Sequence, residues 1–126
     1  MEVLVDTSVW IDYFRGGINS QDMDLLIDEN LLATNDLILT ELVPYLKVKK
    51  QTKVIALLNE ITKLPLDIQW NEIIDYQVKC LRSGAHGIGI PDLIIAQNAK
   101  QQNCKVYSLD KHFQLLNTVL KLNLHG

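Results

Sequence analysis

Two short, mostly apolar runs, one near each end of the chain, are each followed directly by an aspartate. Val3-Leu4-Val5 precedes Asp6, and Val106-Tyr107-Ser108-Leu109 precedes Asp110. Runs of this length and composition predict strands that are buried on both faces, as in a parallel sheet. Because parallel strands end at the same edge of a sheet, we expect the two carboxylates to emerge close together.

Helical patterns separate these strands. They cover residues 9–15, 36–50, 72–81, 91–102 and 111–116, and Ser20 and Thr52 can begin two further helices. The third pattern places Ile74, Val78 and Leu81 on one face. We expect further strands at 31–33, at 64–66 as a weak edge strand, and at 120–124, where the chain could close the sheet.

Strands that alternate with helices predict an α/β fold, with a small, mostly parallel central sheet flanked by helices on both faces. The chain has 126 residues, of which 48% are hydrophobic, so it has the size and composition of one domain with a real core. We therefore expect residues 1–126 to form a single domain.

The net charge of −3 is unevenly distributed along the chain. Residues 1–41 carry nine acids and one Arg, whereas residues 42–92 have a net charge of +2 and residues 93–126 of +3. An acidic site flanked by basic surface suits a protein that binds a cation and attracts phosphates. The alternative is that the lysines at 47–53 simply form a solvated helix face.

The sequence predicts a cytoplasmic protein without a membrane segment. Its first residues lack a basic n-region, and its apolar runs are far shorter than the roughly 18 residues that span a membrane. Cys80 and Cys104 lack CxxC spacing, and the histidines do not complete a zinc pattern around them. We expect two reduced, partly buried thiols.

Asp92 follows Pro91 in the first turn of a predicted helix and shares a face with Ala96 and Ala99. Small residues of this kind allow close packing on the sheet, so we expect the face to turn the carboxylate toward the strand ends. The helix N-terminus there stabilises negative charge.

Glu41 is flanked at helical spacing by apolar and aromatic residues, namely Leu37, Ile38, Tyr45 and Val48. We therefore expect its carboxylate on an apolar face. An ionised group that is buried there without a partner is destabilising by several kcal/mol, so it needs a cation or a functional reason.

Each of these acids taken alone could be an ordinary turn, capping or surface residue. Brought together, four carboxylates would raise one another's pKa unless a hard cation neutralised them. Mg²⁺ or Mn²⁺ is the natural partner, since both accept oxygen ligands and both can activate water and neutralise a phosphodiester. No Ser-His-Asp or Cys-His arrangement competes convincingly, and the glycine-rich loop at 84–89 lacks the ending of a phosphate-binding loop.

The pattern resembles a PIN domain, and within that family the VapC-type ribonuclease toxins of toxin–antitoxin pairs. Four segments carry the resemblance, in the family's order and over nearly the whole chain: VDTSVWID at 5–12, LTEL at 39–42, IPDLIIA at 90–96 and VYSLDKHF at 106–113.

The resemblance implies endonucleolytic hydrolysis of RNA by activated water, with one or two Mg²⁺ or Mn²⁺ ions as cofactor. It assigns the metal to four acids and a substrate- or water-positioning hydroxyl to Ser8, with Thr7 as a further candidate. It also implies a homodimer and a cognate antitoxin protein whose tail lies across the active-site cleft. The four acids are Asp6, Glu41, Asp92 and Asp110.

Two positions depart from the family's pattern. Ser108 stands where the family often has Thr, and His112 stands where many members carry another acid. The second departure leaves four carboxylates instead of five, so a second metal position stays open. Asp12 recurs in the family's opening motif, but we interpret it as a surface acid paired with Arg15, three residues later.

Alternative functions are a catalytically inactive interaction module and a receiver-type signalling domain. A receiver needs a Lys near the end of the last strand and an acid pair after the first, whereas Asp110 and Thr7-Ser8 stand there. A metal-dependent phosphatase would need an Asp-x-Asp motif after the first strand, which is absent. All four acids are present, which favours the nuclease over the inactive module.

Overall fold

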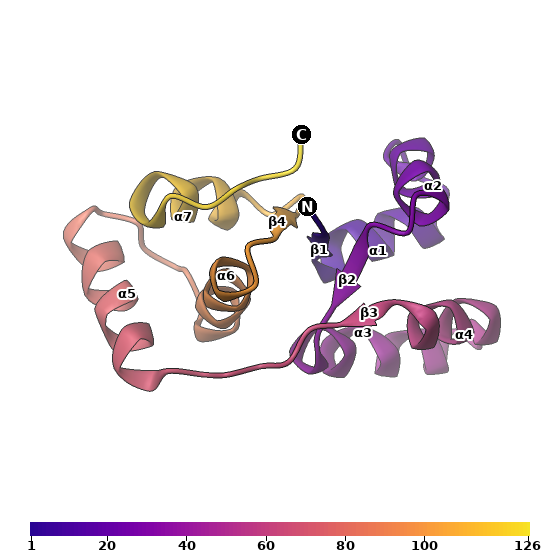
Figure 1. Ribbon diagram of the computed structural model, residues 1–126, viewed down its shortest axis with the longest axis horizontal. Coiled ribbons are helices and arrows are strands. Elements are labelled where there is room, and N and C mark those ends of the chain that lie inside the picture. Colours follow the sequence, from indigo (N-terminus) through magenta and orange to yellow (C-terminus); the bar gives the residue numbers. More distant parts are fainter.

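A four-stranded parallel sheet forms the centre of the computed structural model, which describes residues 1–126 (Figure 1). Its strands lie in the order β3-β2-β1-β4, and the register places Leu4 of β1 between Ala33 of β2 and Val106 of β4. The strands are β1 (Val3–Val5), β2 (Leu32–Thr34), β3 (Thr62–Lys63) and β4 (Lys105–Tyr107).

Seven helices cover both faces of this sheet, which confirms the predicted α/β fold. They are α1 (Thr7–Phe14), α2 (Ser20–Asp28), α3 (Asp36–Val48), α4 (Thr52–Glu60), α5 (Trp70–Arg82), α6 (Ile90–Gln101) and α7 (Lys111–Leu120). None of them is long and apolar enough to cross a membrane. Pro44 lies inside α3.

The alternation of side chains along the strands divides the core into two parts. Leu4, Ala33 and Val106 face the group formed by α5, α6 and α7. Val5 and Tyr107 face the opposite group, α1 to α4. Figure 1 shows the two helix groups on either side of the sheet. Cys80 and Cys104 are buried free thiols in the first group, as expected.

Two of the predicted strands are wrong in position. The third strand is Thr62–Lys63 and not 64–66, because Pro65 has no N–H group with which to continue the ladder. The segment 120–124 is not a strand: α7 extends to Leu120, and the chain then makes only an isolated bridge from Leu124 to Val106.

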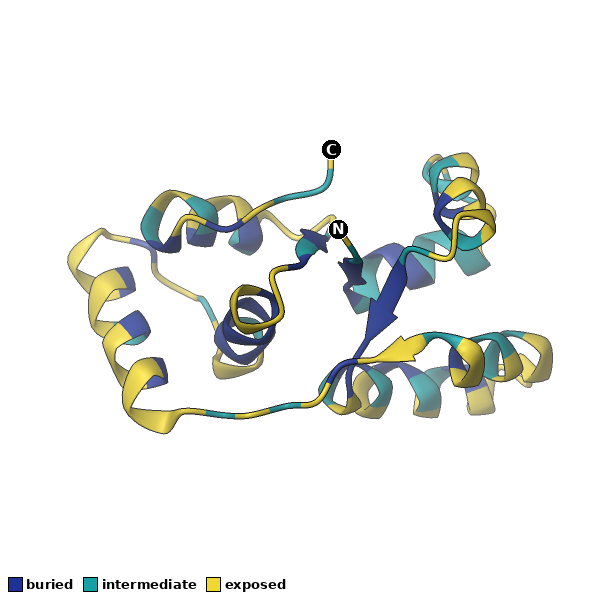
Figure 2. Ribbon diagram, in the orientation of Figure 1, coloured by how far each residue is buried: buried dark blue, intermediate teal, exposed yellow.

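The outer surface of α5 carries the face that the sequence pattern had singled out. Ile74, Val78 and Leu81 are 59%, 38% and 62% exposed, whereas Ile73 and Tyr76 point into the core. The helix has two apolar stripes, and packing against α6 and α7 uses only one of them. Figure 2 shows the exposed outer side of α5 and the buried inner side.

Helix α6 lies at the centre of its group and is buried all round, from Leu93 to Ala99. Ala96 and Ala99 are almost completely buried, as the small-residue face predicted. This burial fixes the start of α6, and with it Asp92, against the ends of the strands. The same packing therefore builds the core and positions an acidic side chain.

Candidate active site

Asp6 connects the end of β1 to the start of α1 and is only 9% exposed. Its Oδ2 atom accepts hydrogen bonds from Ser8 Oγ at 3.0 Å and from Ser108 Oγ at 2.8 Å. Its backbone N–H donates to the carbonyl of Tyr107 on β4. The carboxylate is therefore held by residues from both ends of the chain.

Ser8 and Ser108 together join the end of β1 to the end of β4. Their hydroxyl oxygens lie 3.3 Å apart. Ser8 Oγ accepts from the backbone N–H of Leu109, and Ser108 Oγ accepts from that of Asp110, both at 3.0 Å. Ser8 thus lies beside the metal-site candidates, as the resemblance implied. Ser108, which the sequence marked only as a departure from the family's pattern, orients the Asp6 carboxylate and binds the backbone of Asp110.

Asp110 begins α7, and its Oδ1 accepts the backbone N–H of His112 at 3.0 Å. Asp92 lies in the first turn of α6 and is half-buried. Burial raises the pKa of Asp92, and the charges of Asp110 and Asp6 raise it further, although a hydrogen bond with His112 opposes the shift. The two strand-end aspartates and Asp92 therefore converge, as the sequence predicted.

His112, left open by the sequence, lies inside this cluster. Its Nδ1 atom is 3.3 Å from Asp92 Oδ2 and 3.6 Å from Asp110 Oδ1. One ligand atom from each of these three residues can be chosen so that all lie within 4.8 Å of one another.

Glu41 reaches the cluster from α3 but does not lie on a buried apolar face, so that expectation was wrong. The residue is exposed, and among its neighbours Ile38 is fully buried whereas Val48 is 79% exposed, so Glu41 lies where the buried face of α3 meets solvent. Its carboxyl group is nevertheless partly withdrawn from water, which raises its pKa, and the charges of Asp6 and Asp92 raise it further. Glu41 therefore interacts electrostatically with Asp6 and Asp92 from the solvent-exposed side of the acidic cluster.

Thr7 differs from Ser8 in its surroundings. Its Oγ1 atom is buried and has no hydrogen-bond partner. The hydroxyl takes no part in the network around Asp6, so its proposed contact with substrate or water stays a prediction.

Asp12 is not paired with Arg15, so that interpretation was wrong. Its Oδ2 accepts hydrogen bonds from the backbone N–H and the side-chain amide of Asn19, at 3.2 and 3.3 Å. Asn19 Oδ1 in turn accepts from the hydroxyl of Tyr107. Asp12 therefore fixes the loop between α1 and α2, away from the acidic cluster.

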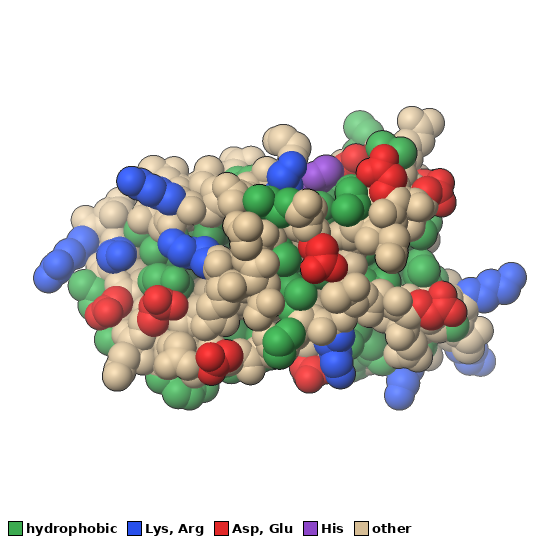
Figure 3. All heavy atoms as spheres, in the orientation of Figure 1, with side chains coloured by type: hydrophobic (Ala, Val, Ile, Leu, Met, Phe, Trp, Pro, Cys, Tyr) green, Lys and Arg blue, Asp and Glu red, His purple; other side chains and the backbone are tan.

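The donor set fits a divalent cation. Carboxylates from four separate elements influence one another here: burial is the main cause of the raised pKa values of Asp92 and Glu41, and the charges of the neighbouring acids raise both further. Acidic side chains gather over α2, Lys and Arg side chains project over the far end of α4, and both kinds of charge lie over α5 (Figure 3). These acids are not those of the candidate site, so an acidic site flanked by basic surface stays a prediction.

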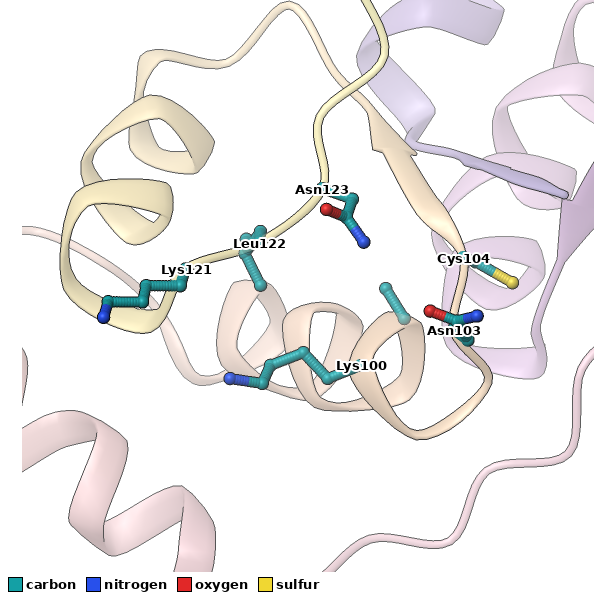
Figure 4. A pocket seen from close by; sticks show the side chains of 7 residues that line it. Lys100, Asn103, Cys104, Lys121, Leu122 and Asn123 are labelled. Carbon is teal, nitrogen blue, oxygen red and sulfur yellow. The ribbon is translucent and has the colours of Figure 1, made fainter. Parts of the chain in front are cut away.

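A separate hollow lies at the opposite edge of the sheet, near the start of β4. It has a volume of about 180 Å³ and is lined by the end of α6 and the chain that follows α7 (Figure 4). Lys100 Nζ donates to the carbonyl of Leu120 at 2.7 Å, so this lysine ties the two segments together. None of the four acids contributes to it.

The model of the PIN domain family matches residues 3–118, which is nearly the whole chain. The chain belongs to the PIN domain family. This match confirms the resemblance drawn from the four segments, and the four candidate acids lie within the matched residues. A comparison with curated proteins by sequence finds no significant match.

Several solved structures have a similar fold. VapBC2 from Rickettsia felis, bound to a DNA fragment from its promoter, superposes with a TM-score of 0.77 at 19% identity, over 99% of this chain and 98% of the other. DNA-bound VapBC from Salmonella typhimurium superposes with a TM-score of 0.75 at 14% identity, over 99% of this chain and 97% of the other. FitAcB from Neisseria gonorrhoeae superposes with a TM-score of 0.69 at 20% identity, over 98% of this chain and 96% of the other. At these identities the likeness shows the fold.

Proposed function

We propose that this PIN domain is a divalent-metal-dependent endoribonuclease, the toxin of a toxin–antitoxin pair. The observation that carries the proposal is the convergence of Asp6, Asp92 and Asp110 at one edge of the sheet. Glu41 is close enough for the charges of Asp6 and Asp92 to raise its pKa. Because the substrate would be cellular RNA, we place the protein in the cytoplasm.

In this proposal the four acids hold Mg²⁺ or Mn²⁺. When bound, the ion supplies a Lewis acid that lowers the pKa of water and neutralises charge on the phosphodiester. Asp6 is held in place for this role by two hydroxyl groups, Ser8 and Ser108. Ser8, in the first turn of α1, positions the substrate or the attacking water, and Thr7 is the further candidate for this role.

Cleavage of a mixed cellular RNA pool by the purified protein tests the proposal. We expect cleavage with Mg²⁺ or Mn²⁺, none with a chelator, and none in the Asp92→Asn variant. Asp28→Asn, which removes an exposed acid at the end of α2, is the matched control and should leave cleavage unchanged. Cleavage by Asp92→Asn would overturn the site, and a folded, metal-binding protein that cuts no RNA would favour the inactive interaction module.

A cognate antitoxin is the proposed protein partner, with its tail across the acidic site. The similar folds of VapBC proteins, which are solved as complexes, support this proposal. Co-purification with the product of a neighbouring gene, followed by loss of RNA cleavage in the complex, would test it. Cleavage that persists in a stable complex would contradict the placement of the tail.

A homodimer is the second proposed assembly, and the exposed face of α5 supports it. Trp70, Ile74, Val78, Leu81 and Ile90 are between 38% and 62% exposed. All five line a shallow hollow of about 430 Å³. Contiguous apolar surface of this kind marks protein–protein contacts.

The molar mass in solution tests this assembly. Light scattering should give twice the 14.3 kDa of one chain, and Ile74→Lys should reduce the mass to that of a monomer. Val48→Lys, which changes an isolated exposed residue on α3, should leave the dimer intact. A wild-type monomer would contradict the proposal.

A further inference from the structure

His112 occupies a position between two acids of the proposed metal site. It is the second residue of α7, and its backbone N–H binds the carboxylate of Asp110. This capping contact fixes the backbone of His112, and with it the point from which the imidazole side chain extends. Since Asp92 is fixed by the buried helix α6, the imidazole and both carboxylates come from rigid elements.

The orientation of the ring directs one nitrogen toward the acids. Nδ1 lies 3.3 Å from Asp92 Oδ2 and 3.6 Å from Asp110 Oδ1. The other nitrogen, Nε2, faces the glycine loop, since a Cβ atom added at Gly87 would lie 3.9 Å from it. Gly87 has a φ of +82°, a backbone conformation that favours glycine.

The spacing of the three donors suits one ion. Neighbouring ligands of an octahedral ion with bonds of about 2.1–2.2 Å lie about 3 Å apart, and opposite ligands about 4.3 Å apart. The distances from Nδ1 to the two carboxylates, and the 4.8 Å limit on the whole set, are close to this range.

We propose that His112 Nδ1 is a metal ligand beside Asp92 and Asp110, and that this imidazole makes the site prefer Mn²⁺ to Mg²⁺. The inference rests on the proposed function, because it assigns a ligand to the same metal site. Imidazole nitrogen is a good ligand for transition-metal ions, whereas Mg²⁺ favours carboxylate and water oxygens. Replacing an acid by His at this position therefore changes the metal that the site selects.

Pulsed electron paramagnetic resonance of bound Mn²⁺ gives a direct test. In protein labelled with ¹⁵N only at histidine, we expect a ¹⁵N coupling to Mn²⁺ that disappears in His112→Ala and persists in His86→Ala, an exposed histidine of the glycine loop. Mn²⁺ that binds the wild type without ¹⁵N coupling would overturn the inference and leave the proposed function standing.

Calorimetric titration at one fixed pH measures the preference. His112→Ala should weaken Mn²⁺ binding at least about 10-fold and Mg²⁺ binding less, while His112→Asp should shift the ratio of affinities toward Mg²⁺. Equal losses for both ions would show a structural role for His112 and overturn the inference. If the wild type bound neither ion, the proposed function itself would fail together with the inference.

Discussion

Ser108 Oγ donates a 2.8 Å hydrogen bond to Asp6 Oδ2, although the two residues lie 102 positions apart in the sequence. The bond crosses from the end of β4 to the end of β1. It fixes the carboxylate that β1 presents at the edge of the sheet, and it couples that carboxylate to Asp110, whose backbone N–H binds the same hydroxyl.

We therefore expect Ser108→Ala to reduce RNA cleavage without unfolding the protein. Loss of a hydrogen bond that orients a metal ligand typically lowers metal affinity or activity about 10–100-fold. Ser108→Thr keeps the hydroxyl and should retain most of the activity, and Ser83→Ala, at the exposed end of α5, is the control. The Mg²⁺ concentration needed for half-maximal cleavage is the quantity to measure. Full activity in Ser108→Ala would contradict the role.

Glu41→Gln should stabilise the metal-free protein at neutral pH. Partial burial and the charges of Asp6 and Asp92 raise the pKa of Glu41 above its ordinary value of 4.5, so the ionised carboxylate is destabilising in the folded state. The gain in Tm should be full above the raised pKa. The gain should shrink as the pH falls through the raised pKa of Glu41. It should vanish below about 4.5, where this carboxyl group is protonated in both the folded and the unfolded chain.

Thermal melts of the wild type and Glu41→Gln in chelator, taken from pH 4 to 8, check this sign. With Mg²⁺ at neutral pH, the wild type should instead have the higher Tm, because Glu41→Gln loses a metal ligand. A Tm difference that is independent of pH would mean that the effect does not come from the charge of Glu41.

Asp12→Ala should destabilise the fold by about 1–3 kcal/mol, since hydrogen bonds to a charged acceptor are among the stronger ones. The variant leaves the backbone and side-chain amides of Asn19 without their acceptor. Arg15→Ala is the matched control and should have little effect, because Asp12 is not paired with it. Urea unfolding of both variants measures the difference. A larger loss in the free energy of unfolding for Arg15→Ala than for Asp12→Ala would contradict the pairing of Asp12 with Asn19.

Asn35→Ala should cost about 2–4 kcal/mol in the free energy of unfolding. Asn35 is completely buried, caps α3 by accepting the N–H of Ile38 at 2.8 Å, and donates to Asn98 Oδ1 at 2.9 Å. The substitution removes the cap and leaves a buried amide on α6 without a donor. Gln51→Ala, at a helix start without a side-chain cap, should change stability by less than about 0.5 kcal/mol. Denaturant unfolding provides both values.

Local sequence patterns predicted most of the fold, because strand burial and helix spacing are properties of short segments. The apolar run before Asp6 and the small residues after Asp92 indicated where each element would place its acid. The same reasoning failed at Glu41, since helical spacing shows which residues share a face but not which face meets the core. At α5 the same spacing correctly placed Ile74 and Leu81 on one face, but it did not show that this face lies outside and that Ile73 lies inside.

The sequence by itself therefore determined the α/β alternation, the parallel sheet and the acids at the ends of its elements, because these follow from periodicity and from the common direction of parallel strands. Only the tertiary structure decided which distant side chains meet. It joined Ser8 to Ser108, separated Asp12 from Arg15 and brought His112 to Asp92. Such contacts depend on how whole helices pack across a sheet, and a one-dimensional pattern does not contain that geometry.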